Sequence, residues 1–314
     1  MDLKQIESFV RVAELGSFSR AAVALGIAQP LLSRHVRQLE VEYRQTFLLR
    51  NGRGVTLTDR GQAFSQRALR IIDDLNLAAD EVAEQGHELV GQLRIAAPLS
   101  FGSRYLGELL FPFLAHHPRL QVALDLEDRT VDLVREGYDL GIRVTRNPAL
   151  ELKARRLALS RRVVVCSPAY RQREGDPVDY EELLRHPAIG YANVSASQLW
   201  QFEPPLTGGE VKALPMRGRI VVNNGESAMS AAKAGLGVAM LPLFIVAEAL
   251  CKGELVCIAG FASPVPDHIY AVYPQTRYVS RAVRGVIDYL VTSLSETPPW
   301  ERGLPCGVRP EETP

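Results

Sequence analysis

The segment LGIAQPLLSRHVRQLE, residues 25–40, combines apolar, basic and hydroxyl side chains at helical spacing. At about 100° per residue, a helix that begins near Gln29 places an apolar stripe on one side, formed by Leu32, Val36, Leu39 and Tyr43. The other side carries, in its first turns, Gln29, Pro30, Leu31, Ser33, Arg34 and Arg37. Arginine can form two hydrogen bonds to guanine, glutamine can do so to adenine, and an apolar side chain can contact the thymine methyl group. We therefore expect this helix start to read base edges and Arg37 to contact phosphate.

The preceding residues predict two shorter helices joined by glycine turns. Residues 3–13 have helical apolar spacing before Gly16, and residues 18–25 repeat it before Gly26. Pro30 suits the start of the third helix, because a first helical turn does not use its missing N–H. This arrangement is a helix-turn-helix, in which the last helix enters the major groove of DNA by its N-terminal end.

A predicted hairpin follows the third helix. Residues 47–49 and 55–57 read as short strands around a glycine-containing turn. Its basic side chains, Arg50 and Arg53, would project toward the DNA backbone or minor groove. Ser17 and Ser19, at the start of the second helix, complete the predicted DNA-binding set. The alternative is a solvated basic surface on a three-helix bundle.

Composition limits the function classes. The 314 residues suffice for two or three domains, and the composition is globular, with 46% hydrophobic and 23% charged residues. The net charge is zero, but residues 1–60 hold nine lysines and arginines against six acidic residues. No apolar run is long enough to cross a membrane, and the N-terminus lacks the features of a signal peptide. We expect a cytoplasmic protein without a membrane partner.

Residues 58–85 predict one long helix with an apolar stripe formed by Ala68, Leu69, Ile71, Ile72, Leu75, Leu77, Ala78, Ala79 and Val82. Thr58 is a good N-cap and Asp59 suits the positive end of the helix dipole. A helix of this length between two domains favours pairing with the same helix of a second chain. The alternative is a helix that lies on its own domain.

From Gly91 onward, short β-rich runs alternate with helical patterns, which predicts an α/β fold with a mainly parallel sheet. The last stretch, residues 297–314, is rich in proline and glycine and predicts a disordered tail.

Taken together, ESFVRVAELGSFSRAAVALGIAQPLLSRHVRQLE and LLRNGRGVTLTDRG resemble the LysR-type transcriptional regulators, and the resemblance extends to about residue 295. It implies a multidomain protein: an all-α winged helix-turn-helix over residues 1–58, a linker and dimerisation helix over 59–88, and an effector domain over 91–296. That domain would be similar to the periplasmic binding proteins, with subdomain I at about 91–165 and 267–296 and subdomain II at about 166–266. The family pattern also points to DNA reading by Gln29, Pro30, Ser33 and Arg34, with Arg53 in the wing.

The resemblance further implies the partners. They are double-stranded DNA that carries an interrupted inverted repeat, a small-molecule effector between the two subdomains, and a second chain paired through the linker helix, with a homotetramer built from two such dimers. Two departures from the family pattern matter. Tyr43-Arg44 stands where a leucine or isoleucine followed by glycine is usual, and Pro98-Leu99 makes the cleft lip more apolar.

Ligands of open α/β sheets bind beyond the carboxyl ends of the strands. This rule selects the effector-binding set Leu99, Ser100, Phe101, Arg129, Thr130, Arg143, Phe202, Asn223 and Asn224. Ser100 near a helix start suits an anion, or it is a plain N-cap. Arg143 could bind an anionic effector or pair with Asp128 or Asp139, and Phe202 could line the cleft or belong to the core. We expect a small, partly apolar or aromatic metabolite.

The sequence contains no complete catalytic, metal-binding or dinucleotide-binding motif that would indicate an enzyme. The six histidines show no metal-ligand spacing, no GxSxG segment occurs, and Gly235-Leu236-Gly237 is an incomplete dinucleotide loop. The four cysteines form no CxxC pair and read as buried thiols, with a redox pair of Cys251 and Cys257 as the alternative. We expect no catalytic residue, metal or cofactor. A solute receptor or an enzyme with the same α/β domain is the rival class, but neither would need residues 1–58.

Overall fold

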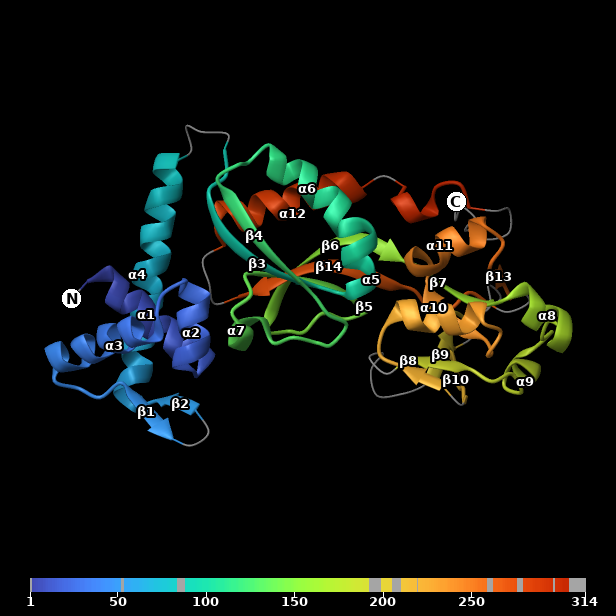
Figure 1. Ribbon diagram of the computed structural model, residues 1–314, viewed down its shortest axis with the longest axis horizontal. Coiled ribbons are helices and arrows are strands. Elements are labelled where there is room, and N and C mark those ends of the chain that lie inside the picture. Colours follow the sequence, from blue (N-terminus) through green and yellow to red (C-terminus); the bar gives the residue numbers. More distant parts are fainter. Residues whose placement is uncertain are drawn as a thin grey trace.

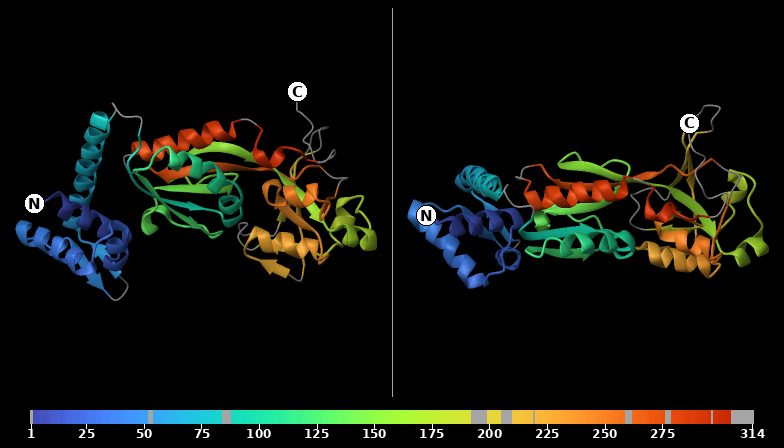
Figure 2. Two further views of the ribbon diagram at one scale, coloured as in Figure 1. Left: turned by 45° about the horizontal axis from the view of Figure 1, so that its top comes forward. Right: turned by 90° about the horizontal axis from the view of Figure 1, so that it is seen from above.

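The computed structural model describes residues 2–51, 54–83, 88–191, 199–204, 210–218, 220–258, 262–275, 279–295 and 297–304. Along its longest axis the molecule consists of an N-terminal domain, a long helix beside it, and two α/β subdomains (Figure 1 and Figure 2). In these ranges no helix has the length and apolar character that a membrane span requires.

The N-terminal domain has three helices and a two-stranded antiparallel hairpin: α1 (Leu3–Leu15), α2 (Phe18–Leu25), α3 (Gln29–Tyr43), β1 (Leu48–Asn51) and β2 (Gly54–Leu57). Gly16 and Gly26 end the first two helices in the left-handed region, with φ of 59° and 63°. This confirms the predicted glycine turns, because residues with a Cβ rarely adopt that conformation. The core includes stacked Phe47 and Phe64 rings, whose centroids are 4.7 Å apart.

Helix α4 (Asp59–Ala83) follows the hairpin. The Gly61 N–H donates to the Thr58 hydroxyl oxygen at 2.9 Å, which confirms the predicted N-cap. Ala68, Leu69 and Ile72 pack against the N-terminal domain, but Ile71 and Leu75 are 49% and 46% exposed. The remaining stripe residues lie outside the described side chains: Leu77, Ala78, Ala79 and Val82.

Subdomain I is a five-stranded sheet in the order β4-β3-β5-β14-β6. Its strands are β3 (Gly91–Ala97), β4 (Leu120–Leu126), β5 (Leu140–Thr145), β6 (Leu152–Ser160) and β14 (Asp267–Pro274). α6 (Gly107–Ala115) and α12 (Arg281–Leu294) lie along one face, and the short α7 (Leu133–Glu136) lies on the other (Figure 1). α5 (Leu99–Phe101) and the π-helix η1 (Gly102–Leu106) lead from β3 into α6.

Only part of this sheet is parallel, so the prediction of a mainly parallel sheet is wrong. β3 pairs in parallel with β4 and β5, whereas β14 is antiparallel to both β5 and β6. The reason is the two-subdomain architecture. β6 leaves toward subdomain II and β14 returns from it, so β14 runs against its neighbours.

The described residues of subdomain II form three small sheets and four helices. β7 (Arg162–Cys166) pairs antiparallel with β12 (Ala239–Pro242) and β13 (Val256–Cys257). β8 (Ile189–Tyr191) is parallel to β11 (Ile220–Val222), and β9 (Leu199–Phe202) is antiparallel to β10 (Lys212–Pro215). The helices are α8 (Pro168–Glu174), α9 (Tyr180–Leu183), α10 (Gly225–Lys233) and α11 (Leu243–Cys251). Because β7 already belongs to this subdomain, the boundary lies at about Arg162 rather than at 166.

The two chain crossings between the subdomains are joined by a buried ion pair. Arg162, at the first crossing, donates to Asp267, at the second, with an N–O distance of 2.7 Å. Asp267 is 4% exposed, and Arg146 lies 3.5 Å from its other carboxylate oxygen. A carboxylate buried this deeply requires such charged partners.

The C-terminal stretch departs from the sequence prediction of a disordered tail. The 3-10 helix η2 (Pro299–Glu301) follows α12, and Trp300 and Leu304 are 2% and 4% exposed. The prediction is wrong for residues 297–304. A composition rich in proline and glycine suggests disorder, but it does not show that the Trp300 side chain is buried against other aromatic rings. Residues 305–314 lie outside the described part of the chain.

The end of α3 generates a stability prediction. Arg44 is its C-cap and has φ of 51°, the one non-glycine residue with positive φ among those described. Because the left-handed conformation costs a residue with a Cβ about 1 kcal/mol, we expect Arg44→Gly to stabilise the N-terminal domain by about that amount. Native-state hydrogen exchange of the α1 and α3 amides in the full chain measures this change.

Gly26→Ala is the matched control, since the same left-handed geometry is already occupied by glycine there. This variant should lower the opening free energy of the same amides by about 1 kcal/mol. An Arg44→Gly variant whose amides exchange faster than those of the unmodified chain would contradict the prediction.

Candidate nucleic-acid interface and inter-subdomain site

The exposed face of α3 carries most of the predicted DNA-reading side chains. Leu32, Val36 and Leu39 are buried in the domain core, and Tyr43, at the helix end, is 41% exposed. The opposite face exposes Gln29, Pro30, Leu31, Arg34 and Arg37, with Ser33 half-buried. Leu31 is 42% exposed, as the helical spacing predicts. Sequence periodicity therefore placed this face correctly, because one continuous helix fixes the direction of every side chain.

Polar contacts hold the start of this face in place. The Ser19 hydroxyl donates to the Gln29 side-chain oxygen at 3.0 Å, which leaves the amide NH2 of Gln29 as the donor end. On the inner side, the His35 ring nitrogen lies 2.9 Å from the Ser8 hydroxyl and ties α3 to α1. Within the described residues, neither Arg34 nor Arg37 has an ion pair. Both guanidinium groups are therefore available to a phosphate or a base.

The other predicted DNA contacts differ in their surroundings. Ser17 caps α2 and accepts the Arg20 N–H at 3.4 Å, which is the structural role of an N-cap. The Arg50 guanidinium lies over the Phe18 ring, 4.1 Å from its centroid, so this arginine rests against its own domain. Arg53 lies outside the described residues.

Two helix starts face each other where subdomain I meets subdomain II. Ser100, in α5, is 2% exposed, and a Cβ added at Gly225, the first residue of α10, would lie 3.1 Å from its hydroxyl oxygen. Asn224 caps α10 and accepts the Ser227 N–H at 2.8 Å, and the Asn224 amide donates to Asn223 at 3.3 Å. The same Cβ would lie 2.3 Å from Cδ1 of Ile245 in α11, so glycine at 225 is required first by packing within subdomain II and only second by the approach to Ser100. The structure therefore brings Ser100 together with Asn223 and Asn224, as the strand-end rule predicts.

An ion pair crosses the same junction. Arg104 of η1 donates two hydrogen bonds to Glu226 of α10, at 2.8 and 2.7 Å, and lies 3.5 Å from Glu248 of α11. The hydrogen bonds from Arg104 lower the pKa of Glu226 and raise the pKa of Arg104. The pair is therefore charged at neutral pH and is lost only as acid protonates Glu226. Sequence analysis missed both residues, because a glutamate in the first turn of a helix reads as a simple response to the helix dipole.

Two buried oxygen atoms at this junction have no hydrogen bond of good geometry among the described residues: Oγ of Ser100 and Oδ2 of Asp128. The Ser100 hydroxyl lies close enough to Glu226 to help lower the pKa of that carboxyl. The second carboxylate oxygen of Asp128 accepts the Leu99 N–H at 2.8 Å. Burial and the nearby Asp128 carboxylate raise the pKa of Tyr191, from β8 of subdomain II. Unsatisfied buried oxygens are costly to folding and are typical of sites that a ligand or water completes.

Tyr191 also borders a cavity of about 60 Å³ in subdomain II. Its other walls include Leu199, Trp200, Met216 and Met240, with Arg162 as a charged member, and polar and apolar atoms line it about equally. Periodicity could not have found it, because the lining comes from five separate short strands and their connections.

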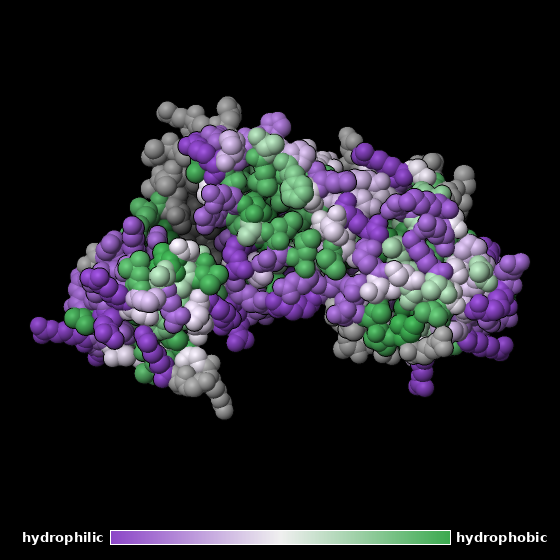
Figure 3. All heavy atoms as spheres, in the orientation of Figure 1, coloured by the Kyte–Doolittle hydropathy of each residue, from purple (hydrophilic) through white to green (hydrophobic). Residues whose placement is uncertain are grey.

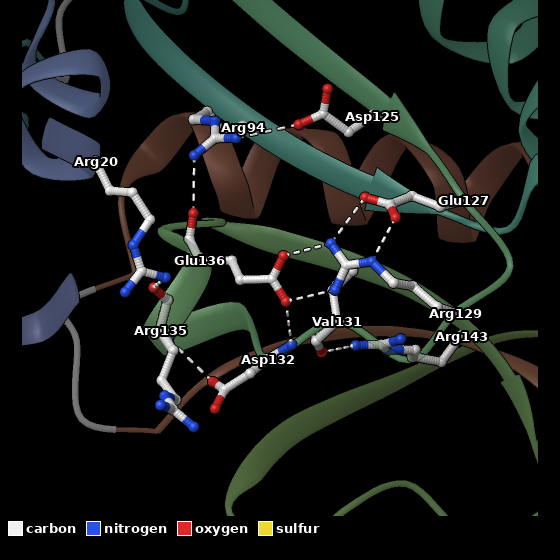
Figure 4. A network of polar contacts seen from close by, with 10 residues as sticks. All are labelled: Arg20, Arg94, Asp125, Glu127, Arg129, Val131, Asp132, Arg135, Glu136 and Arg143. Atoms are coloured by element: carbon white, nitrogen blue, oxygen red, sulfur yellow. Dashed lines mark hydrogen bonds and ion pairs between the residues drawn. The ribbon is translucent and has the colours of Figure 1, made fainter. Parts of the chain in front are cut away.

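The predicted residues Arg129 and Arg143 lie around α7 (Figure 4), and Thr130 precedes α7 in the chain. Arg129 bridges Glu127 and Glu136 through hydrogen bonds of 2.5–3.0 Å, and these bonds lower the pKa of Glu136. Arg143 donates to the Val131 carbonyl, and its own burial lowers its pKa. Arg129 and Thr130 directly follow Asp128, whose carboxylate accepts the Leu99 N–H at 2.8 Å, so their backbone lies beside the chain that carries Ser100. The Arg129 side chain is nevertheless bound to Glu127 and Glu136, and the Arg143 side chain to the Val131 carbonyl.

The remaining predicted residues of the cleft are mostly buried. Phe202 is fully buried in the core of subdomain II, with its ring centroid 5.2 Å from that of Tyr180. Phe101 is also fully buried, while Leu99 is half-buried. Cys166 and Cys257 lie on neighbouring strands, and burial raises the pKa of each thiol to about 11. At neutral pH both thiols are protonated. The prediction of buried thiols is confirmed for Cys166 but is wrong for Cys251, which is exposed at the end of α11; Cys257 is half-buried and Cys306 lies outside the described residues.

The N-terminal domain and subdomain I meet along α2 and α7. Arg20 donates to the carbonyl oxygens of Leu15, at 2.5 Å, and of Arg135, at 3.5 Å. An open cavity of about 530 Å³ lies in this seam, with Ser19, Arg20 and Val23 on one wall and residues including Arg135 on the other. The seam thus combines this open cavity with direct packing of α1 on α7, where Leu15 lies beside Gly137.

Comparison with known proteins identifies the two parts of the chain. Residues 3–62 match the model described as "Bacterial regulatory helix-turn-helix protein, lysR family", and residues 86–295 match "LysR substrate binding domain". The chain is 33% identical over 299 residues to the HTH-type transcriptional regulator PtxR of Pseudomonas aeruginosa, covering 95% of both chains. It is 31% identical to an uncharacterized HTH-type transcriptional regulator, YhjC, of Escherichia coli, covering 93% of this chain and 97% of that one.

Solved structures of full-length chains agree. The chain is similar to the virulence activator AphB of Vibrio cholerae, with 26% identity, a TM-score of 0.58, and coverage of 94% of this chain and 100% of that one. It is also similar to CrgA, a LysR-type regulator from Neisseria meningitidis, with 27% identity, a TM-score of 0.58, and coverage of 94% and 99%. With a winged helix-turn-helix at one end and a two-subdomain effector domain at the other, the chain belongs to the LysR-type family of DNA-binding transcriptional regulators.

Proposed function

We propose that this chain is a cytoplasmic regulator that reads an interrupted inverted repeat through α3. The observation that carries the proposal is the division of this helix into a buried apolar face and an exposed face with Gln29, Leu31 and Arg34. Arg34 and Gln29 would bond base edges, and Leu31 would contact a thymine methyl group. Arg37, Arg50, Arg53, Ser17 and Ser19 would contact the backbone.

Two chains pair through α4 in this proposal. A 25-residue helix spans about 37 Å, and its exposed Ile71 and Leu75 have no apolar cover among the described residues. A second copy of α4 would bury them and hold two α3 helices for successive major grooves. Hydrophobic side chains also gather on subdomain I around α6, where Phe111 is 61% exposed (Figure 3). This surface supports a second contact between chains and hence a homotetramer.

The effector site in this proposal is the junction of α5 and α10. Ser100, Asp128 and Tyr191 would supply hydrogen bonds, Asn223 and Asn224 would lie at the rim with Leu99, and the apolar side chains of the cavity would take a nonpolar part of the ligand. Phe101 is buried and would support the wall of the site without contacting the ligand directly. A ligand that binds one angle between the subdomains better than another shifts the population toward it, and the tetramer would transmit this shift to DNA bending.

Arg34→Ala should weaken binding to the specific operator by about 1–3 kcal/mol, with little change on unrelated DNA, because it removes a base contact. Fluorescence anisotropy against operator and random duplexes measures both. Arg37→Ala is the matched control on the same helix face. This variant should weaken binding to both duplexes by the same amount. It should also reduce the magnitude of the slope of log K against log salt concentration by about one unit. Equal losses on the two duplexes for Arg34→Ala would refute base reading by this residue.

The double variant Ile71→Asp with Leu75→Asp should convert the chain to monomers at micromolar concentration, because two carboxylates cannot be buried between paired helices. Light scattering after size-exclusion chromatography measures the mass. Gln62→Asp places the same charge on an exposed position of α4 and should leave the assembly intact. A double variant of unchanged mass would exclude pairing through this part of α4.

Small carboxylates, aromatic acids and neutral aromatic compounds should be screened by thermal shift on the full chain. A ligand at one hundred times its Kd adds about 2.7 kcal/mol, which raises the melting temperature by several degrees. Ser100→Ala should reduce that shift without destabilising the unliganded protein, because it removes a buried hydroxyl that has no hydrogen bond of good geometry among the described residues. An undiminished shift would move the site away from Ser100.

Arg143→Met is the second arm of this screen, because the sequence predicts Arg143 as an anion contact. Loss of the shift in this variant, with operator binding retained, would assign the arginine to the effector. A retained shift would leave Arg143 with its bond to the Val131 carbonyl and a purely structural role.

A further inference from the structure

Residues 297–304 lie beyond the matched substrate-binding domain, which ends at residue 295. They leave α12 of subdomain I and continue to α11 of subdomain II, against which η2 packs (Figure 1). We call this segment the C-terminal strap. Nothing in the family match accounts for it, so its contacts must explain why it is ordered.

Trp300 anchors the strap in a cluster of aromatic rings drawn from both subdomains. Its ring centroid lies 5.9 Å from Phe101 and 5.0 Å from Tyr105, which precede α6 in subdomain I, and 5.9 Å from Phe244 in α11 of subdomain II. Edge-to-face contacts of this kind depend on ring orientation as well as burial. Phe101 and Phe244 also contact each other directly, with centroids 5.6 Å apart, and Trp300 packs on both rings of this pair. Changing the angle between the subdomains would therefore disturb all three ring contacts at once.

Packing rather than hydrogen bonding holds this tryptophan. Its indole N–H is buried without a hydrogen-bond partner among the described residues. Phenylalanine at the same position would keep an apolar ring and remove the unsatisfied donor. Trp300→Phe keeps an aromatic ring at this position and Trp300→Ala removes it, while both variants keep the segment. Comparing the two therefore isolates the effect of the ring contacts.

The strap also reaches the first chain crossing. The Glu301 carboxylate accepts a hydrogen bond from Arg161 at 3.2 Å, and Arg161 connects β6 to β7. The Arg161 carbonyl in turn accepts the Leu243 N–H, at the start of α11, at 2.8 Å. Further along, the Gly303 carbonyl lies 3.6 Å from the Cys251 sulfur at the end of α11, and Leu304 is buried. The strap thus contacts both subdomains and the connection on which they would turn.

We propose that the C-terminal strap fixes the angle between subdomains I and II and that Trp300 is a positioning residue for the α5–α10 junction. Trp300 packs on Phe101, the neighbour of Ser100 in α5, so loss of the ring frees the helix that carries Ser100. The effector role of this junction rests on the proposed function above. The mechanical role of the strap does not, because it concerns the unliganded chain alone.

Hydrogen exchange of the full chain, without DNA or ligand, tests the proposal. Trp300→Ala should speed exchange in α5, α10 and the β6–β7 connection on the order of tenfold, while Trp300→Phe stays near the unmodified chain. Leu183→Ala is the control, because Leu183 is equally buried but lies in α9, away from the junction. This control should speed exchange mainly around α8 and α9.

Two results would overturn the proposal. One is unchanged exchange in α5 and α10 when only η2 and α11 exchange faster in Trp300→Ala, since the strap would then be a passive cover. The other is an exchange pattern that Trp300→Ala shares with Leu183→Ala, which would show general loss of stability. Neither result depends on DNA binding, so each is separate from a failure of the proposed operator or effector function.

A second measurement leaves the strap intact. The chain has two tryptophans, so Trp200→Phe leaves Trp300 as the sole indole emitter. A docked strap gives short-wavelength emission that resists acrylamide quenching, whereas emission typical of exposed indole in the folded protein would contradict the proposal. This arm remains informative if Trp300→Ala does not fold.

Discussion

The close approach of two helix starts, at Ser100 in α5 and Gly225 in α10, is the constraint on which the effector domain depends. A Cβ at position 225 would collide with Ile245 of α11 at 2.3 Å and press on the Ser100 hydroxyl at 3.1 Å, so glycine keeps both α11 and α5 close to this helix start. The bidentate pair of Arg104 and Glu226 then holds the two subdomains in register. The buried pair of Arg162 and Asp267 fixes the crossings behind them. The angle between the subdomains is therefore set at two separate places, and the aromatic contacts of the strap add a third.

The side of subdomain I that meets the N-terminal domain, around α7, has a different character. Around α7, Arg129, Glu127 and Glu136 form an ion-pair cluster that is largely exposed, and Arg94 bonds Asp125 and the Glu136 carbonyl. Exposed pairs of this kind contribute little to stability. The contact with the N-terminal domain passes through the same element, by way of Arg20. A firmly held junction between the two subdomains is thus combined with a loosely held contact to the N-terminal domain.

How far the sequence predicts this molecule depends on how local each signal is. The α3 face follows from spacing within one helix, so Leu31 and Arg34 are where periodicity places them. Arg129 and Arg143 were assigned to the cleft because each follows or ends a strand, but the direction of the side chain at a strand end is decided by neighbours such as Glu136. Trp300 was missed for the opposite reason: its partners Phe101 and Phe244 are far away in sequence, and the surrounding prolines suggested disorder.

The seam beside α2 has a consequence for how the molecule responds to its solvent. Because a cavity of about 530 Å³ separates the two walls, opening or closing the seam changes the amount of water held there more than it changes protein contacts. Solutes that are excluded from protein surfaces raise the free energy of such hydrated space. Any change in the orientation of the DNA-binding domain that alters this space would therefore respond to excluded solutes as well as to a specific ligand.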